Sequence, residues 1–311
     1  MIDDKLIATL IQQFFNALTI GGIYALIALG YTMVYGIIEL INFAHGDIFM
    51  VGAFMGLTFL TALGFSGSIS DPLIFILVLL ASFAVVMPLL GLVGVGIERF
   101  AYRPLRNAPR LAPLITAIGV SFILQNVIYI IEGPSPQPFP QLLSPQNRFQ
   151  LLGASVSYIS VLIFVVTMVL LIGLQLFVGR SRLGRAMRST AQDREAAQLM
   201  GVNINTTIAL TFFLGSALAG AAGIVYGLYF GTVAFNIGFI GGLKAFTAAV
   251  LGGIGNTTGA VLGGFMIGFI EVISAQLGLA IWAHAIVFAV LVIVLVFRPS
   301  GLLGQPIGER A

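Results

Sequence analysis

The pattern of hydrophobic and polar positions divides the chain into long apolar segments separated by short polar or basic stretches. The first segment carries no charge from Lys5 to Glu39 and would measure about 50 Å as a helix, more than the roughly 30 Å of a bilayer core. We therefore expect it to tilt, or to end near Gly30 or Gly36, with Glu39 at the membrane interface. The other apolar runs span residues 48–70, 72–97, 111–131, 149–179, 196–243, 245–270 and 272–297.

These runs predict an all-α, polytopic transmembrane helical bundle of roughly eight or nine membrane segments, some of them broken or re-entrant. The composition agrees, because 59% of the 311 residues are hydrophobic and only 8% are charged, whereas a soluble protein carries roughly 25% charged residues. Glycine is abundant, with 38 residues, and small residues let membrane helices pack closely. We expect residues 1–311 to form a single domain without a cleavable signal peptide.

Basic residues indicate the orientation in the membrane, since positively charged loops face the cytoplasm. They gather in three clusters, at residues 99–110, at residues 180–194 and at Arg298 with Arg310. Placing all three clusters inside puts the N-terminus outside and the C-terminus in the cytoplasm. The connection 132–158 is then an external loop, and its prolines favour an extended, non-helical conformation.

Two glycine-rich stretches, 41–47 and 241–256, interrupt the apolar pattern in opposite halves of the chain. Paired interruptions of this kind are typical of inverted repeats in transporters, and irregular backbone survives in a membrane only against protein or a water-filled cavity. We therefore place both stretches near a translocation path and treat the inverted repeat as a hypothesis. The path residues predicted in this way are Asn42, Phe43, His45, Gly46, Phe246, Thr247, Gly252, Gly253 and Asn256.

Residues 180–201 carry five arginines in a chain that is otherwise nearly free of charge. Asp193 is a suitable helix N-cap, Glu195 would lie in a first turn that favours an anion, and Gly201 can end the helix in the left-handed conformation. The sequence therefore predicts a short helix from Asp193 to Gly201. Its pattern alone leaves two interpretations open, a helix that docks onto a soluble motor or an ordinary basic cytoplasmic loop.

Ionisable residues within the apolar runs each allow two interpretations. His45 and Asp47 could relay protons, but we favour a structural role in which they cap a helix start with help from Asn42. Lys244 could neutralise a solute carboxylate, but we favour an interfacial position reached by snorkelling. Glu271 and His284 lie on neighbouring late segments, and we favour a packing contact or an interfacial position over a proton-carrying pair.

Signals of enzyme chemistry are absent from the sequence. Neither lysine, Lys5 nor Lys244, lies in a phosphate-binding G-x-x-x-x-G-K-[ST] loop, so the chain lacks that route to ATP hydrolysis. Two histidines and no cysteine exclude HExxH and thiolate metal sites. We expect no cofactor on this chain, and the net charge of only +3, held in clusters, does not indicate nucleic-acid binding.

Several motifs resemble a known family. Glu195-Ala196-Ala197, followed four residues later by Gly201, resembles the EAA loop of ABC importer permeases. The wider sequence is similar to branched-chain amino acid permeases of the LivH type over about 280 residues. The matching stretches are 22–36, 41–46 (INFAHG), 97–106, 181–201, 244–255 and 298–304.

The resemblance implies the permease subunit of an ATP-driven ABC importer in a bacterial inner membrane, which moves branched-chain or other neutral amino acids into the cytoplasm. A periplasmic or lipid-anchored binding protein would deliver the solute, a second related permease would complete a heterodimer, and two ATPase subunits would use ATP and Mg. The coupling loop would be residues 180–205. Its implied coupling residues are Arg185, Arg188, Asp193, Arg194, Glu195, Ala196, Ala197 and Gly201.

Three alternatives remain open from the sequence. An importer of the same architecture could carry urea or short amides, because the binding protein largely selects the solute. A proton-coupled secondary transporter could use Glu271, His45 or Asp47. A passive channel or scaffold would act without nucleotide. A requirement for added ATPase subunits, rather than for a pH gradient, would distinguish the importer from the other two classes.

Overall fold

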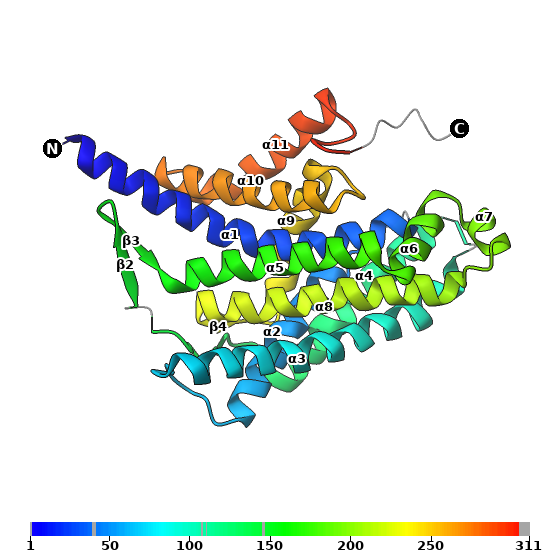
Figure 1. Cartoon of the computed structure of the whole chain (residues 1–311), viewed down its shortest axis with the longest axis horizontal. Helices are drawn as coiled ribbons and strands as arrows, with labels where there is room; N and C mark the ends of the chain where they lie inside the picture. The colour runs from blue at the N-terminus through cyan, green and yellow to red at the C-terminus, as the bar shows by residue number, and fades with distance from the viewer. Residues whose placement is uncertain (1, 39–41, 107, 110, 145–146, 305–311) are drawn as a thin grey trace.

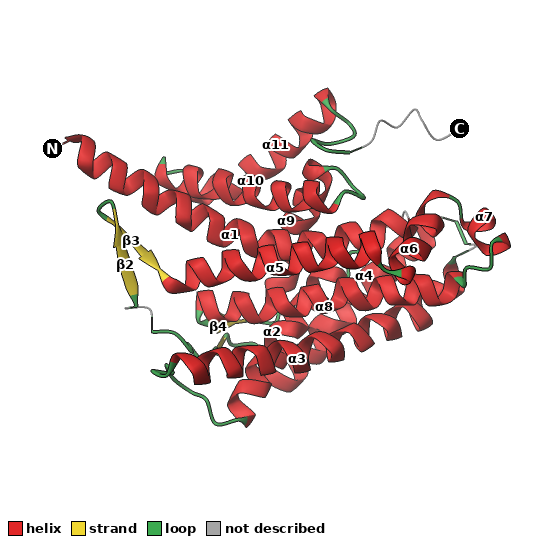
Figure 2. Ribbon diagram, viewed as in Figure 1, coloured by secondary structure: helices red, strands yellow, loops and turns green. Residues whose placement is uncertain are grey.

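The computed structural model describes residues 2–38, 42–106, 108–109, 111–144 and 147–304, and they form an elongated bundle of helices (Figures 1 and 2). Within this described part, eight helices are long and apolar enough to cross a membrane, as the apolar runs predict. These eight are α1 (Ile2–Ile38), α2 (His45–Ala62), α3 (Pro72–Ile97), α4 (Leu111–Glu132), α5 (Tyr158–Arg180), α8 (Ile204–Phe230), α10 (Thr257–Gln276) and α11 (Ala283–Phe297). A ninth apolar helix, α9 (Ile237–Gly252), is shorter.

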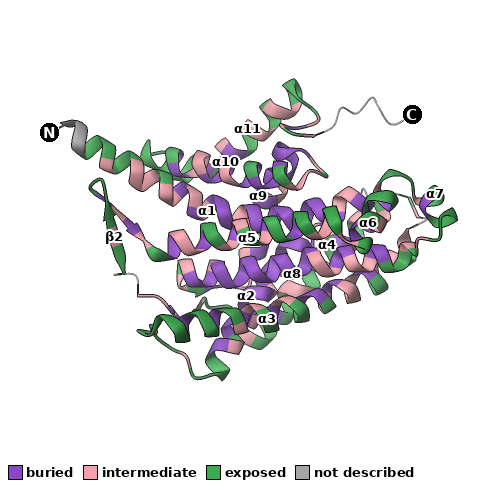
Figure 3. Cartoon of the chain, viewed as in Figure 1, coloured by how far each residue is buried: buried purple, intermediate pink, exposed green. Residues whose placement is uncertain are grey.

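The centre of the bundle is formed by α1, α2 and α8, whereas α4, α5 and α11 expose most of their surface (Figure 3). Glycines make this centre compact. A Cβ at Gly223 of α8 would collide with the backbone of α2, and a Cβ at Gly264 of α10 would lie 2.6 Å from Cα of Ala25 in α1. Such close backbone approach is how small residues hold membrane helices together.

The first helix passes through Gly30 without interruption and ends at Ile38, two residues after Gly36, so of the two predicted end points only Gly36 lies near the end of the helix. Both glycines serve contacts between helices. The His45 imidazole fills the space where a Cβ of Gly30 would lie, and a Cβ at Gly36 would be 3.3 Å from Cα of Gly255. Glu39 lies outside the described residues.

The two glycine-rich stretches differ from each other in the structure. A turn at residues 42–44 precedes α2, with residues 40–41 outside the described part. In the second stretch α9 runs unbroken to Gly252, and the chain turns only at residues 253–256, where Gly253 and Gly255 have φ of 109° and 90°. The helices α2 and α9 nevertheless meet near their N-terminal ends, because Gly46 of α2 packs against Gly238 and Gly242 of α9.

The connection between α4 and α5 is extended, as its prolines predict, but it also forms strands. A hairpin joins β2 (Arg148–Leu151) to β3 (Ala154–Ser157), and β1 (Gln137–Pro138) pairs with β4 (Thr232–Val233). The apolar run that starts at residue 149 becomes helical only at Tyr158, where α5 begins with Ser157 as its N-cap, at the end of the predicted external connection 132–158. Pro145 lies outside the described residues.

The opposite end of the bundle carries two short helices, α6 (Arg182–Gln192) and α7 (Arg194–Leu199) (Figure 1). The sequence predicts α7 but not α6. Ser181 caps α6 by accepting from the backbone N–H of Gly184 at 2.8 Å. The C-terminal ends of α1, α3 and α5 lie at this same end, which we call the α7 end, and the β2–β3 hairpin marks the other, the hairpin end.

Candidate functional site

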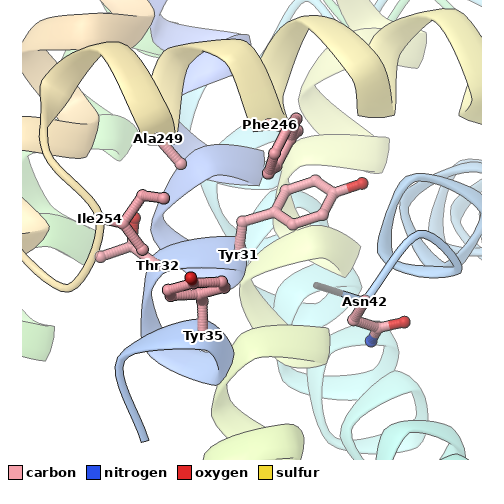
Figure 4. A pocket seen from close by; sticks show the side chains of 7 residues that line it. All are labelled: Tyr31, Thr32, Tyr35, Asn42, Phe246, Ala249 and Ile254. Carbon is pink, nitrogen blue, oxygen red and sulfur yellow. The ribbon is translucent and has the colours of Figure 1, made fainter. Parts of the chain in front are cut away.

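A small pocket lies where α1 crosses α9 (Figure 4). One wall is the α1 face that carries Tyr31, Thr32 and Tyr35, residues that share a side because a helix repeats every 3.6 residues. The other wall is α9 and the turn after it. The residues lining the pocket are Tyr31, Thr32, Tyr35, Asn42, Phe246, Ala249 and Ile254.

Two polar side chains of this pocket are buried without their full set of hydrogen bonds. Thr32 and Asn42 are 1% and 2% exposed, and neither Thr32 Oγ1 nor Asn42 Nδ2 has a partner among the described residues. Asn42 Oδ1 accepts a hydrogen bond from the Tyr102 hydroxyl at 2.9 Å, which fixes the amide. Buried polar groups without partners are costly, so these two atoms are suited to meet a polar ligand.

Aromatic rings form most of the remaining surface. The Tyr31 ring lies 6.0 Å from the Phe246 ring and 4.7 Å from the His45 ring, and Phe43 lies 6.1 Å from Phe246. The pocket therefore combines an apolar, aromatic lining with a hydroxyl and an amide. In this conformation it has room for about one water molecule.

The predicted path residues separate into two groups. Asn42 and Phe246 line the pocket, Phe43 and His45 pack behind it, and Gly46 joins α2 to α9.

The second group lies at the turn after α9. A Cβ at Gly252 would collide with the carbonyl of Gly259 in α10, and Gly253 packs against Gly304. Asn256 caps α10 and donates to the carbonyl of Leu303 at 2.9 Å. These contacts give a packing reason for the motif, and a role in the path stays a prediction for this group, as for Thr247, whose hydroxyl bonds within α9.

Sequence reasoning missed Tyr31, Thr32 and Tyr35, whereas Ala249 and Ile254 lie in the stretch 241–256 that was placed near the path but were not among the residues named there. The three α1 residues lie inside an unbroken apolar run, where neither a charge nor a helix interruption singles them out. The spacing of the two tyrosines, four residues apart, was the one available signal, and it is common to any helix face.

Asp47 has a structural role, although not the expected one. Ala44, rather than Asn42, is the N-cap of α2, and no side chain caps this helix. The fully buried Asp47 carboxylate instead accepts hydrogen bonds from Ser121 Oγ and from Gln125 Nε2, the latter at 2.9 Å. It therefore ties the start of α2 to the middle of α4.

Lys244 forms a buried ion pair, so the expectation that it reaches the interface is wrong. Its Nζ lies 2.5 Å from Glu271 Oε1 and donates to the Tyr24 hydroxyl at 3.0 Å. The same hydroxyl donates to Glu271 Oε2 at 3.0 Å. The triad joins α9, α10 and α1, and His284, which is 55% exposed, lies 4.0 Å from the Glu271 carboxylate.

The predicted helix at the α7 end is confirmed in its details. Asp193 Oδ1 accepts from the backbone N–H groups of Glu195 at 2.8 Å and Ala196 at 3.0 Å. Gly201 follows the helix with φ of 84°. Ala197 faces the protein, whereas Leu199 and Met200 at the tip are 88% and 85% exposed.

The arginines of this segment differ in what they contact. Arg194 Nη2 donates to the carbonyl oxygens of Ile37 at 3.0 Å and Ile38 at 2.8 Å. Arg188 donates to the carbonyl of Val178, and Arg185 makes a long contact of 3.5 Å with that of Arg180. Arg194 thus reaches the end of α1, and the other two reach the end of α5.

A second ionic cluster lies beside this segment. The fully buried Glu98 carboxylate pairs with Arg103, at 2.9 Å, and with Arg106, and Arg106 also donates to Asn205 Oδ1 at 2.6 Å. Burial lowers the pKa of Arg106, against the influence of Glu98. An open cleft runs from Arg106 past the end of α1 to residues 190–195. Arg110 and Arg310 lie outside the described residues.

No group of three or more His, Cys, Asp or Glu side chains in the described part of the chain could hold a metal ion. Together, the site consists of a pocket within the bundle and a polar, basic segment at its end, joined by α1.

Comparison with known proteins gives consistent matches. The family model described as branched-chain amino acid transport system / permease component matches residues 13–295. The high-affinity branched-chain amino acid transport system permease protein BraD of Pseudomonas aeruginosa is 46% identical over 96% of this chain and 97% of its own length. The corresponding LivH protein of Escherichia coli K12 is 41% identical over the same shares. No solved structure matches.

Proposed function

Because the chain belongs to the family of permease components of branched-chain amino acid transport systems, we propose that it is the membrane subunit of an ATP-driven importer of branched-chain or other neutral amino acids. The observation that carries this proposal is the α7 segment. A capped helix with an exposed apolar tip projects from the end of a multi-pass membrane bundle.

The α7 end faces the cytoplasm in this proposal. Arginines from two separate parts of the sequence contact this end, because Arg106 donates to Asn205 at the start of α8 and Arg194 donates to the end of α1, and basic residues are retained on the cytoplasmic side. The hairpin end, with the start of α1, then faces outside. In a bacterium, the protein would lie in the inner membrane, with its C-terminus in the cytoplasm.

The partner of α7 is an ATPase subunit. The adjacent tip residues Leu199 and Met200, which expose their apolar side chains at the end of the bundle, would insert into a cleft of that subunit. The complete importer would contain this chain, a second related permease, two ATPase subunits that use ATP and Mg, and a binding protein that delivers the solute at the hairpin end.

The pocket between α1 and α9 is the solute contact in this proposal. An aromatic lining suits an apolar side chain, and the unpaired atoms of Thr32 and Asn42 suit the polar end of an amino acid. The pocket is too small for an amino acid in the present conformation, so the solute would enter only when α1 and α9 move apart. Such movement is what alternating access requires.

The test is reconstitution of the chain with its candidate partner permease, ATPase subunits and binding protein in liposomes. Uptake of radiolabelled leucine should require ATP on the α7 side and the ATPase subunits. Uptake driven by a pH gradient without those subunits would refute the proposal in favour of proton coupling, for which the buried Asp47 and the largely buried Glu271 are the candidate acids. Transport of urea or short amides in place of leucine would change only the identity of the proposed solute.

A further inference from the structure

The contact between Arg194 and α1 has a specific chemical basis. The last carbonyl groups of a helix lack partners within the helix, and a cation there is favoured by the helix dipole. Arg194 supplies both a charge and two hydrogen bonds, to Ile37 and Ile38. Hydrogen bonds from a charged donor are stronger than those between neutral groups. The first residue of α7 is therefore fastened to the last turn of α1.

The end of α1 is also the wall of the pocket. Tyr35, Thr32 and Tyr31 lie within six residues of Ile37, which is about 9 Å along a helix. The helix is continuous from Ile2 to Ile38, so a displacement at Ile37 is passed to these side chains without an intervening loop. The facing wall is α9, which α7 does not bond in the described structure.

From this geometry we propose that Arg194 is the positioning residue through which α7 moves the α1 wall of the pocket relative to α9. The inference rests on the proposed function, in which an ATPase displaces α7. In this inference Arg194 makes its contact within the permease, whereas the exposed Leu199 and Met200 contact the ATPase.

Two features support this division of roles. Arg194 is only partly exposed and its guanidinium is directed at the bundle, whereas Glu195 and Ala196 beside it are exposed. Arg188 makes a similar bond to a carbonyl, but on α5, which does not line the pocket. Arg194 is therefore the arginine of α6 and α7 whose described contacts lead to the pocket.

The chain contains no cysteine, so a disulfide within it can form only between the two cysteines that are introduced. Tyr35→Cys and Ile254→Cys, placed on the α1 wall and on the turn after α9, should cross-link to different extents in the reconstituted complex with and without ATP plus vanadate. With Arg194→Gln this nucleotide-dependent difference should disappear and uptake should fall, while the ATPase subunits still co-purify. Arg194→Lys, which keeps the charge but loses the planar fork, should retain part of the difference.

Arg182→Gln is the matched control, because Arg182 lies exposed at the start of α6 and has no bond to α1 among the described contacts. It should leave the difference intact. An unchanged difference in Arg194→Gln would overturn the inference alone. A separate Leu199→Cys variant tests the premise: if it fails to cross-link to an ATPase subunit, the proposed function fails and this inference with it.

Discussion

At the scale of single residues, the protein retains polar groups that a purely structural bundle would not need. Thr32 and Asn42 each bury an atom without a partner, and Lys244 and Glu271 form an ion pair inside the bundle. Replacing such groups by apolar ones is often neutral or stabilising for a protein. Their presence therefore indicates a functional demand, and this can be tested by separating stability from transport.

Thr32→Val should change stability and transport in opposite directions. The substitution removes a buried hydroxyl that has no partner, so thermal stability in detergent should stay the same or rise, by about 1 kcal/mol at most. Uptake of leucine should fall about five- to tenfold if the hydroxyl meets the solute, the equivalent of one hydrogen bond. Equal uptake by the variant and the native protein would remove Thr32 from the solute contact.

Breaking the Lys244–Glu271 pair should be costly on either side. Lys244→Ala or Glu271→Gln leaves one buried partner uncompensated, which costs about 3–5 kcal/mol for a fully buried pair. The exchange K244E with E271K should recover much of the lost thermal stability, since it restores the pair. If the exchange restores stability but not uptake, the position of the positive charge matters for transport as well as for folding. If the single variants are as stable as the native protein, the pair contributes little to stability.

At the scale of elements, α7 is a short helix held at one end by Asp193 and Arg194 and free at its tip. Its six residues cannot persist as an isolated helix, because a single turn does not repay the cost of nucleation. The N-cap and the bond to α1 therefore keep it folded. Its exposed side is the part available to a partner.

Bulk or reversed charge on that side should uncouple transport without unfolding the bundle. Ala196→Trp and Glu195→Arg alter exposed positions, so membrane insertion and thermal stability should match the native protein. Leucine uptake should fall, whereas ATP hydrolysis by the ATPase subunits should continue. Arg182→Gln again serves as the control. Native uptake by both variants in liposomes would contradict the assignment of α7 as the coupling helix.

At the scale of the whole molecule, the bundle has two chemically different ends, with the arginine clusters at one and the β2–β3 hairpin at the other. The proposed orientation rests on this difference, and the cysteine-free sequence makes the orientation measurable. Ser66→Cys, in the exposed loop between α2 and α3, should react with a membrane-impermeant maleimide added to intact spheroplasts. Leu199→Cys should react only after the membrane is opened, and the reverse pattern would place α7 outside.

Several features follow from the sequence by itself. Run lengths decide which segments can span a membrane, and Asp193 with Gly201 decides where a short helix begins and ends, because these effects act within one or two helical turns. The prolines of residues 132–158 likewise exclude a helix locally. The motifs and their order along the chain were sufficient to identify the family.

Only the tertiary structure decided which residues meet. Lys244 contacts Tyr24, which is 220 residues away in the sequence, and Glu271, which is 27 residues away. Asp47 accepts a hydrogen bond from Gln125, and Arg194 donates one to Ile37. Local pattern could not predict these contacts, because each depends on how whole helices cross and on glycines that let them approach. The pocket between α1 and α9 exists for the same reason: neither helix marks it alone, and their packing creates it.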